Sequence, residues 1–158
     1  MRYVDGLGYR EGRSDIILME ASSGKNNEDL EHSRDDILKS VHGSICALEA
    51  ILRHHPNASF TTASSLLSFT VQSICTTITL STTALDPENI DGFLHQECRS
   101  TEVPVHDDER IKWMKVFELV SKRVIMLRKQ ALIIDQLQKE QSGIIPIDNV
   151  ETVRFVLS

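Results

Sequence analysis

Two carboxylates near the start of the chain, Asp5 and Glu20, have the residue types and the spacing to act together on one substrate. Each lies in a short apolar segment that predicts a β-strand, and Gly12 and Ser14 mark the turn between the segments. If the two strands pair as an antiparallel hairpin, one carboxylate from each can reach a common cation. Two carboxylates on Mg²⁺ are the minimum apparatus for metal-assisted hydrolysis of a phosphodiester.

The same two residues also fit purely structural roles. An aspartate before a glycine, as in Asp5-Gly6, is a common turn residue. A glutamate at the end of a strand, such as Glu20, is usually just solvated. The two residue types alone leave both interpretations open.

A helix is expected over about residues 27–54, because an asparagine can cap its start and Pro56 stops it. Its apolar residues recur at the spacing of one buried helical face: Leu30, Ile37, Val41, Ile45, Leu48 and Leu52. Gly43 inside this helix costs about 1 kcal/mol relative to alanine. Its presence predicts a close approach of the helix to the sheet.

Residues 59–85 are rich in serine, threonine and β-branched side chains, which favours strands over helix. Apolar residues alternate with polar ones over 65–72 and 76–83, so two strands are predicted, each with one wet face. The stretch 86–104 has no consistent period and is expected to be mostly loop.

The strongest helical pattern covers residues 107–142, which contain neither proline nor glycine. Apolar residues alternate there at fours and threes: Trp113, Phe117, Val120, Val124, Leu127, Ala131 and Ile134. The pattern predicts a helix of roughly 33 residues, on the order of 50 Å long. A compact domain of this size is about 30 to 35 Å across, so we expect part of this helix to project, to kink or to pack on another chain. We expect the aromatic first half of the stripe in the core, whereas the second half suits the core or a partner chain equally well.

These elements predict an α/β fold with a small mixed sheet of about four strands flanked by two long helices. The chain has 158 residues, a length that suits one domain. We assign residues 1–142 to that domain, which ends in the long helix, and 143–158 to a C-terminal tail with a short helix or strand.

The formal charge of −6 makes the surface as a whole repel nucleic acid, so a polyanion needs a local basic patch. Lys115, Lys122 and Lys129 repeat at sevens and could touch phosphates, although Glu118, four residues before Lys122, favours a salt-bridged, solvated face. Three distant cysteines indicate neither a disulfide framework nor a zinc knuckle. With no signal region and no membrane-length apolar run, we expect an intracellular protein, cytoplasmic or nuclear, and no membrane partner.

His32 and Asp36 lie four residues apart on one face of the first helix. They could ligate a metal ion or form a charged pair. Because Arg34 and Asp35 lie beside them, a wet helix face is the favoured interpretation.

The order of strand with Asp5, turn, strand ending in Glu20, helix, two strands and a helix resembles the PD-(D/E)XK nuclease fold, in particular its degenerate versions in uncharacterised fungal proteins. The resemblance is sharpest around these two carboxylates and extends to Asp36 and Lys39 on the next helix and to 69–72 on the next strand. It implies a restriction-endonuclease-like sheet, Mg²⁺ bound by the two carboxylates, and nucleic acid as a partner.

The resembling family places a lysine two residues after the glutamate, where it stabilises charge at phosphorus, and this chain has Ser22 there. Serine carries no positive charge, so the resemblance predicts a non-catalytic domain. An active Mg²⁺-dependent nuclease remains an alternative if Lys25 or Lys39 replaces that lysine. A third interpretation is a protein interaction module, in which the helix over 111–141 pairs with a second copy or with a helical partner.

The family's fold usually begins with a helix and a strand ahead of the aspartate, whereas four residues precede Asp5. We therefore expect that the C-terminal segment supplies those elements or that the N-terminus is truncated.

Overall fold

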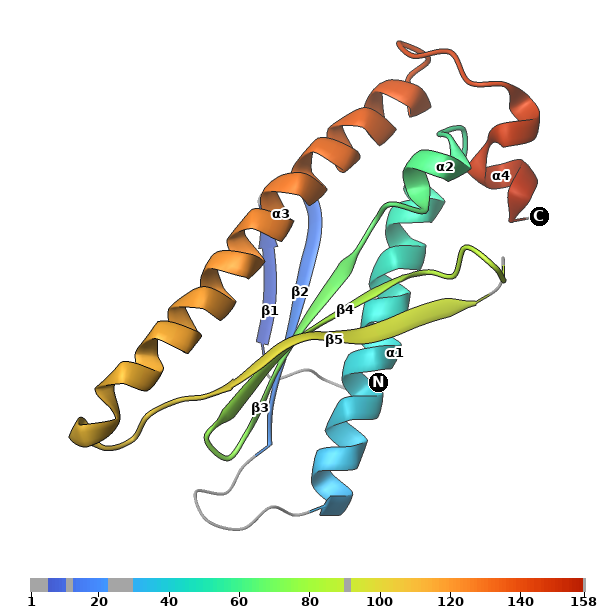
Figure 1. The fold of residues 1–158 in the computed structure, drawn as a ribbon. Helices are drawn as coiled ribbons and strands as arrows, with labels where there is room; N and C mark the ends of the chain where they lie inside the picture. Colours follow the sequence, from blue (N-terminus) through green and yellow to red (C-terminus); the bar gives the residue numbers. More distant parts are fainter. Residues whose placement is uncertain (1–5, 11–12, 23–29, 90–91, 158) are drawn as a thin grey trace.

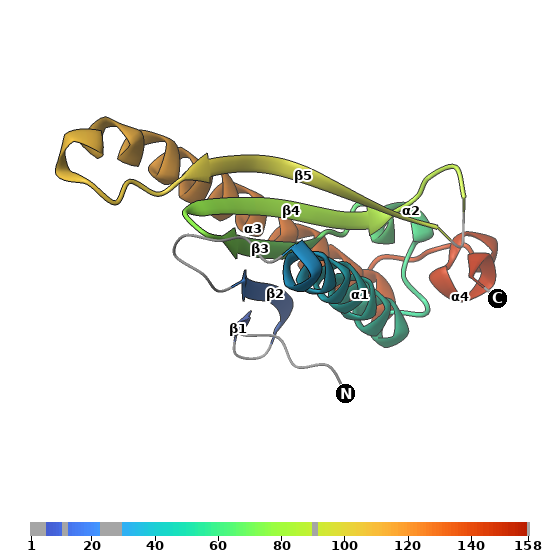
Figure 2. The same ribbon diagram turned by 90° about the horizontal axis from the view of Figure 1, so that it is seen from below.

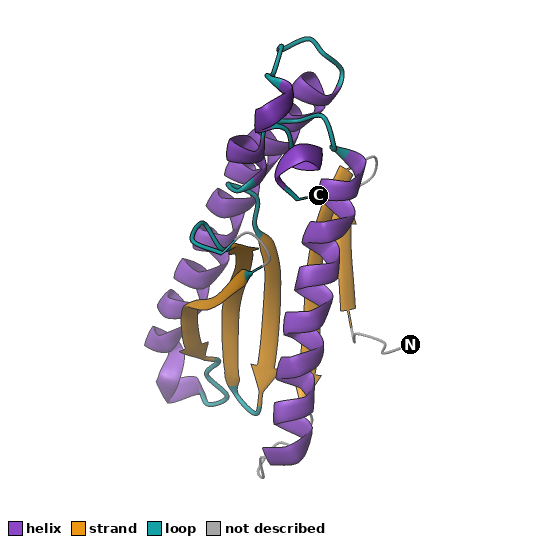
Figure 3. Cartoon of the chain, turned by 90° about the vertical axis from the view of Figure 1, so that its right-hand side faces the viewer, coloured by secondary structure: helices purple, strands orange, loops and turns teal. Residues whose placement is uncertain are grey.

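The structure, a computed structural model, describes residues 6–10, 13–22, 30–89 and 92–157. Within these residues, one sheet contains five strands: β1 (Gly6–Arg10), β2 (Arg13–Ser22), β3 (Ser68–Ile74), β4 (Thr77–Leu85) and β5 (Phe93–Glu102). The described residues also form the α-helices α1 (Leu30–His54), α2 (Phe60–Ala63), α3 (Trp113–Gln141) and α4 (Val153–Val156). Two 3₁₀ turns, η1 (Asp107–Lys112) and η2 (Asn149–Glu151), precede α3 and α4. Figure 3 shows the sheet between α1 on one side and α3 on the other.

The strands lie in the order β1-β2-β3-β4-β5, and β2 and β3 are the parallel pair. A parallel connection must return to the opposite end of the sheet, and α1 makes this crossover. The other neighbours pair antiparallel, including the predicted β1–β2 hairpin. The expected α/β class with a mixed sheet is therefore confirmed.

The expectation of loop over 86–104 is wrong, because β5 occupies most of it and makes the sheet one strand larger than expected. β5 is an edge strand whose side chains are mostly exposed, so it has no apolar alternation to signal it. Backbone pairing with β4 holds it, and this pairing is irregular between Leu80 and Ser81.

The sheet face that α1 covers is polar, and it is buried. Ser44 Oγ on α1 lies 2.6 Å from Thr83 Oγ1 on β4, which lies 2.8 Å from His95 Nδ1 on β5. His95 itself is exposed at the edge of this face, and partial desolvation of its ring lowers its pKa below the ordinary value. The prediction of a wet face over 76–83 is wrong at Thr83, which is fully buried. Its hydroxyl is satisfied by neighbouring side chains instead of water.

The predicted apolar stripe of α1 is correct only in its C-terminal part. Leu48 and Leu52 are buried, but Ile37 is 42% exposed. In the N-terminal part, the buried positions are polar: Asp36, Ser40 and Ser44. The helix is rotated so that these side chains meet the polar face of the sheet.

Gly43 lies on the side of α1 that packs against Leu18 of β2. A Cβ atom added at Gly43 would lie 3.0 Å from Cδ1 of Leu18, tighter than nine in ten real contacts of this kind. The predicted close approach is confirmed, since a side chain there would force the end of the Leu18 side chain to move.

On the opposite face, α3 packs with Leu119 against Val71 and Leu80. The buried positions of the helix are Val116, Leu119, Gln130, Ile134, Leu137 and Glu140. The expectation that the aromatic half of the predicted stripe lies in the core is wrong, because Trp113 and Phe117 are exposed. A helix that is apolar on two sides has one periodicity and two candidate faces, so the repeat alone does not select the buried one.

Two buried polar side chains attach α3 to the region around α2. The Gln130 amide donates to the Leu67 carbonyl at 2.7 Å and accepts from the Leu67 N–H at 3.0 Å. A carboxylate oxygen of Glu140 accepts from the Ser59 N–H at 3.0 Å, and its other oxygen accepts from Thr62 Oγ1 at 2.8 Å. Both anchors lie in the C-terminal part of the helix.

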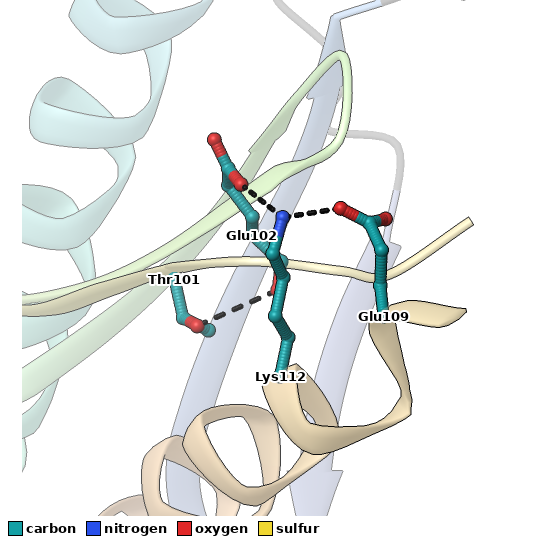
Figure 4. A network of polar contacts seen from close by, with 4 residues as sticks. All are labelled: Thr101, Glu102, Glu109 and Lys112. Carbon is teal, nitrogen blue, oxygen red and sulfur yellow. Dashed lines mark hydrogen bonds and ion pairs between the residues drawn. The ribbon is translucent and has the colours of Figure 1, made fainter. Parts of the chain in front are cut away.

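At its other end, α3 is tied to the end of β5 (Figure 4). The Lys112 ammonium lies 3.3 Å from Oε2 of Glu102 and also pairs with Glu109 of η1. The hydrogen bond that Lys112 donates to Glu109 raises the pKa of Lys112, and the same contact lowers the pKa of Glu109. The residues expected to form the first turns of a longer α-helix form a 3₁₀ turn instead.

The C-terminal tail packs on the turn after α1. Val153 N–H donates to the Ala58 carbonyl, and Arg154 N–H donates to the Pro56 carbonyl, both at 2.9 Å. Val153 is buried in the same apolar cluster as Leu48.

We predict that Gln130→Leu destabilises the fold by about 1 to 3 kcal/mol, because it leaves the Leu67 N–H and carbonyl without their partner. Urea unfolding followed by circular dichroism measures this loss. The matched control is Gln138→Leu on the exposed side of the same helix, which should stay within about 0.5 kcal/mol of the wild type. Equal stability of the two variants contradicts the anchoring role.

Candidate functional site

Two of the four sequence-predicted site residues, Glu20 and Lys39, lie in the described part of the chain. Asp5 and Lys25 lie outside the described residues. Glu20 is on β2 and is 3% exposed. Leu18, two residues earlier on β2, is the residue that Gly43 of α1 approaches, and alternate strand residues share a face, so Glu20 lies on the α1 side.

Lys39 on α1 is held by a neighbouring carboxylate. Its ammonium lies 2.7 Å from Oδ1 of Asp36, and the lysine side chain is 29% exposed. The hydrogen bond that Lys39 donates to Asp36 is the largest cause of a raised pKa at Lys39, and the negative charges of Asp36, Glu20 and Asp35 raise the pKa further. The structure thus brings Lys39 and Glu20 within electrostatic range, although they belong to different elements.

The position of Asp36 differs from the one that the sequence predicted. A wet helix face was favoured for it, but it is 8% exposed and pairs with Lys39. The polar face of the sheet below α1 gives Asp36 a buried environment that helix spacing alone does not reveal. The side chain of His32, its proposed partner, lies outside the described set.

Gln72 on β3 is the neighbour of Glu20 in the parallel register. Among the described residues, its Nε2 atom is buried without a hydrogen-bond partner, as is the Oγ atom of Ser40 on α1. Ser40 lies between Asp36 and Ser44 on the buried stripe of the helix. The environment of Glu20 is therefore polar, enclosed and incompletely satisfied.

The described residues do not make a magnesium site by themselves. Mg²⁺ prefers a near-octahedral set of oxygen ligands. No group of three or more His, Cys, Asp or Glu side chains within the described ranges is placed to hold a metal ion. Near Glu20, the Asp36 carboxylate already binds an ammonium group, so a second carboxylate would have to come from elsewhere in the chain.

The basic strip on α3 makes different contacts from those expected. Glu118 pairs with Arg99 of β5 instead of with Lys122. The Lys122 ammonium donates to the Cys98 carbonyl at 2.8 Å. These two contacts bind the N-terminal half of α3 to β5.

Comparison of the chain with protein-family models, with curated proteins and with solved structures gave no match. In the described part of the chain, no helix has both the length and the apolar character needed to cross a bilayer.

We predict that the pKa of Lys39 falls most in Asp36→Asn and falls less in Glu20→Gln and in Asp35→Asn. The order follows from the hydrogen bond with Asp36, which the other two carboxylates do not make. NMR titration of the Lys39 side chain measures all three values. An unchanged pKa in Glu20→Gln contradicts the proximity of Glu20 and Lys39.

The same pairing gives the stability a defined pH dependence. The folded-state pKa of Lys39 lies above the ordinary value of 10.5, so the pair stabilises the fold fully below about that pH. Its contribution is lost as the pH rises through the raised folded-state pKa. Asp36→Asn should remove this alkaline component from urea unfolding midpoints measured across that range.

Proposed function

We propose that the chain is a nuclease-like α/β domain of the restriction-endonuclease-like type, degenerate at its candidate site and without turnover. The observation that carries this proposal is the position of Glu20. Glu20 lies on β2, which pairs antiparallel with β1 and parallel with β3. The crossover helix α1 between β2 and β3 carries Lys39, whose pKa the charge of Glu20 raises. This is the order of elements on which the family resemblance was based.

The register of the hairpin supports a role for a second carboxylate. Gly6 pairs with Met19. In the sequence, Asp5 directly precedes Gly6 and Glu20 directly follows Met19. We propose that Asp5, which lies outside the described residues, and Glu20 are the residues that would hold a magnesium ion, if one binds.

Three features favour the absence of turnover. Glu20 is almost fully buried, whereas a hydrolytic site must admit a phosphodiester. Ser22 provides no charge to stabilise a pentavalent phosphorus. Lys39, the migrated candidate within the described residues, has its charge neutralised by Asp36 at 2.7 Å.

We predict that the purified chain cleaves neither DNA nor RNA with Mg²⁺ above the level of Glu20→Gln. Single- and double-stranded substrates, separated on denaturing gels, test this. Cleavage by the wild type that is lost in both Glu20→Gln and Asp5→Ala would instead establish an active nuclease. Lys25→Ala and Lys39→Ala then identify which lysine takes part.

We also predict that Ser22→Lys gains weak Mg²⁺-dependent cleavage, because it restores a positive charge two residues after Glu20. The double variant Ser22→Lys, Glu20→Gln should lose it. Ser142→Lys, which adds the same charge at an exposed position after α3, is the matched control and should remain inactive. A folded but inactive Ser22→Lys would show that the burial of Glu20 prevents turnover even when the missing charge is restored.

A second candidate function is a protein interaction module, and a separate observation favours it. α3 carries large apolar side chains on its solvent side, with Phe117 60% and Leu132 72% exposed. Contiguous apolar surface of this kind commonly marks an interaction site.

A further inference from the structure

The solvent side of α3 carries an apolar surface that no other described element covers (Figures 1 and 2). We call it the α3 face and define it by its exposed apolar residues: Trp113, Met114, Phe117, Val120, Val124, Ile125 and Leu132. Part of this face is hollowed into an open groove of about 600 Å³. Met114, Phe117, Ile125 and Met126 line it, and Lys122 and Lys129 stand at its side.

α3 cannot rotate about its axis to bury the α3 face against the sheet. Gln130 and Glu140 fix its C-terminal part to the backbone before and after α2. The Arg99–Glu118 ion pair and the bond from Lys122 to Cys98 fix its N-terminal part to β5. Rotation would break all of these contacts, so the α3 face remains available to a partner.

The charge around the α3 face is opposite to that of the chain as a whole. Residues 113–132 carry five basic side chains and one acidic one, a formal charge of +4, in a chain whose total is −6. Lys115, Lys122, Arg128 and Lys129 are exposed. Two copies packed through this face would bring like charges together, which disfavours self-association. Charge complementarity therefore calls for an acidic occupant.

The apolar residues follow helical spacing along 113–132, a length of about 30 Å at about 1.5 Å per residue. A long groove with apolar side chains at three- and four-residue intervals accepts the apolar side of another helix. The recesses of a hollowed surface can receive the side chains of such a helix. A flat lipid surface would leave these recesses unfilled.

We propose that the α3 face binds an acidic amphipathic helix of a partner protein, an inference that rests on the second candidate function. Its apolar side packs on Phe117 and Ile125. Its glutamates or aspartates pair with Lys122, Arg128 and Lys129.

Trp113 makes this binding measurable in the full chain. It is the single tryptophan of the sequence, and its ring centroid lies 6.2 Å from that of Phe117 on the α3 face. The probe is a synthetic amphipathic helix of about 20 residues with leucine on its apolar side and glutamate flanking it. We expect a saturable blue shift of tryptophan emission. A matched peptide with lysine for every glutamate should bind at least about tenfold more weakly.

Substitutions on and off the face test its role directly. Ile125→Gln should weaken binding of the glutamate peptide at least about tenfold. The control is Leu94→Gln on β5, a residue of similar exposure (50% against 54% for Ile125), which should leave binding unchanged. Lys129→Glu should weaken the glutamate peptide and strengthen the lysine peptide. Arg154→Glu, a charge reversal on α4, should change neither. Circular dichroism of each variant verifies its fold.

Three results would overturn the inference. Equal binding of both peptides indicates apolar adhesion without charge selection. A dimer in light scattering that Ile125→Gln converts to monomer assigns the face to a second copy. A blue shift with vesicles containing phosphatidylserine, absent with pure phosphatidylcholine and with the glutamate peptide, assigns it to an anionic membrane. None of these readouts depends on nuclease activity, so this inference and the nuclease-like assignment fail separately.

Discussion

The rotation of α3 about its own axis is fixed by hydrogen bonds between its buried polar side chains and backbone groups around α2. The Leu67 N–H and carbonyl, just before β3, are both bound by the Gln130 side chain. The Ser59 N–H, at the start of α2, is bound by Glu140. A partly buried backbone group without a partner costs free energy, so these bonds select one rotation of the helix. That rotation decides which of two apolar surfaces enters the core and which meets solvent.

The rotation of α1 is fixed in a comparable way by a polar interface. Ser44 Oγ contacts Thr83 Oγ1, and Asp36 pairs with Lys39, whose pKa the charge of Glu20 also raises. Buried polar and charged groups are tolerated when they satisfy one another, and removing one member leaves the other uncompensated. The environment of Glu20 therefore follows from the packing of the whole helix, and the candidate site cannot be separated from the stability of the fold.

Sequence patterns predicted the elements well and their faces poorly. The hairpin, the extent of α1, the strands β3 and β4 and the approach at Gly43 follow from local signals such as turns, caps and β-branched residues. Periodicity gives the repeat of a helix but not its phase, which is why Ile37 and Phe117 were assigned to the wrong side. β5 lacks an apolar face and depends on pairing with β4, a contact that no local pattern encodes.

The same limit applies to the candidate site. Glu20 was found from its strand, but the buried state of Asp36 depends on the phase of α1 and on the polar side chains below it. The electrostatic effect of Glu20 on Lys39 likewise depends on that phase. Asp5 and Lys25 lie outside the described residues, so their part in the site stays a prediction from sequence.

The distribution of exposed surface favours binding over turnover. A hydrolytic site needs its charged groups open to a phosphodiester, yet Glu20 is 3% exposed and the ammonium of Lys39 is bound by a carboxylate. Transfer of the exposed apolar side chains of α3 out of water would lower the free energy. Because the anchors around α2 and on β5 keep α3 from turning these side chains toward the sheet, we propose that an external partner covers them.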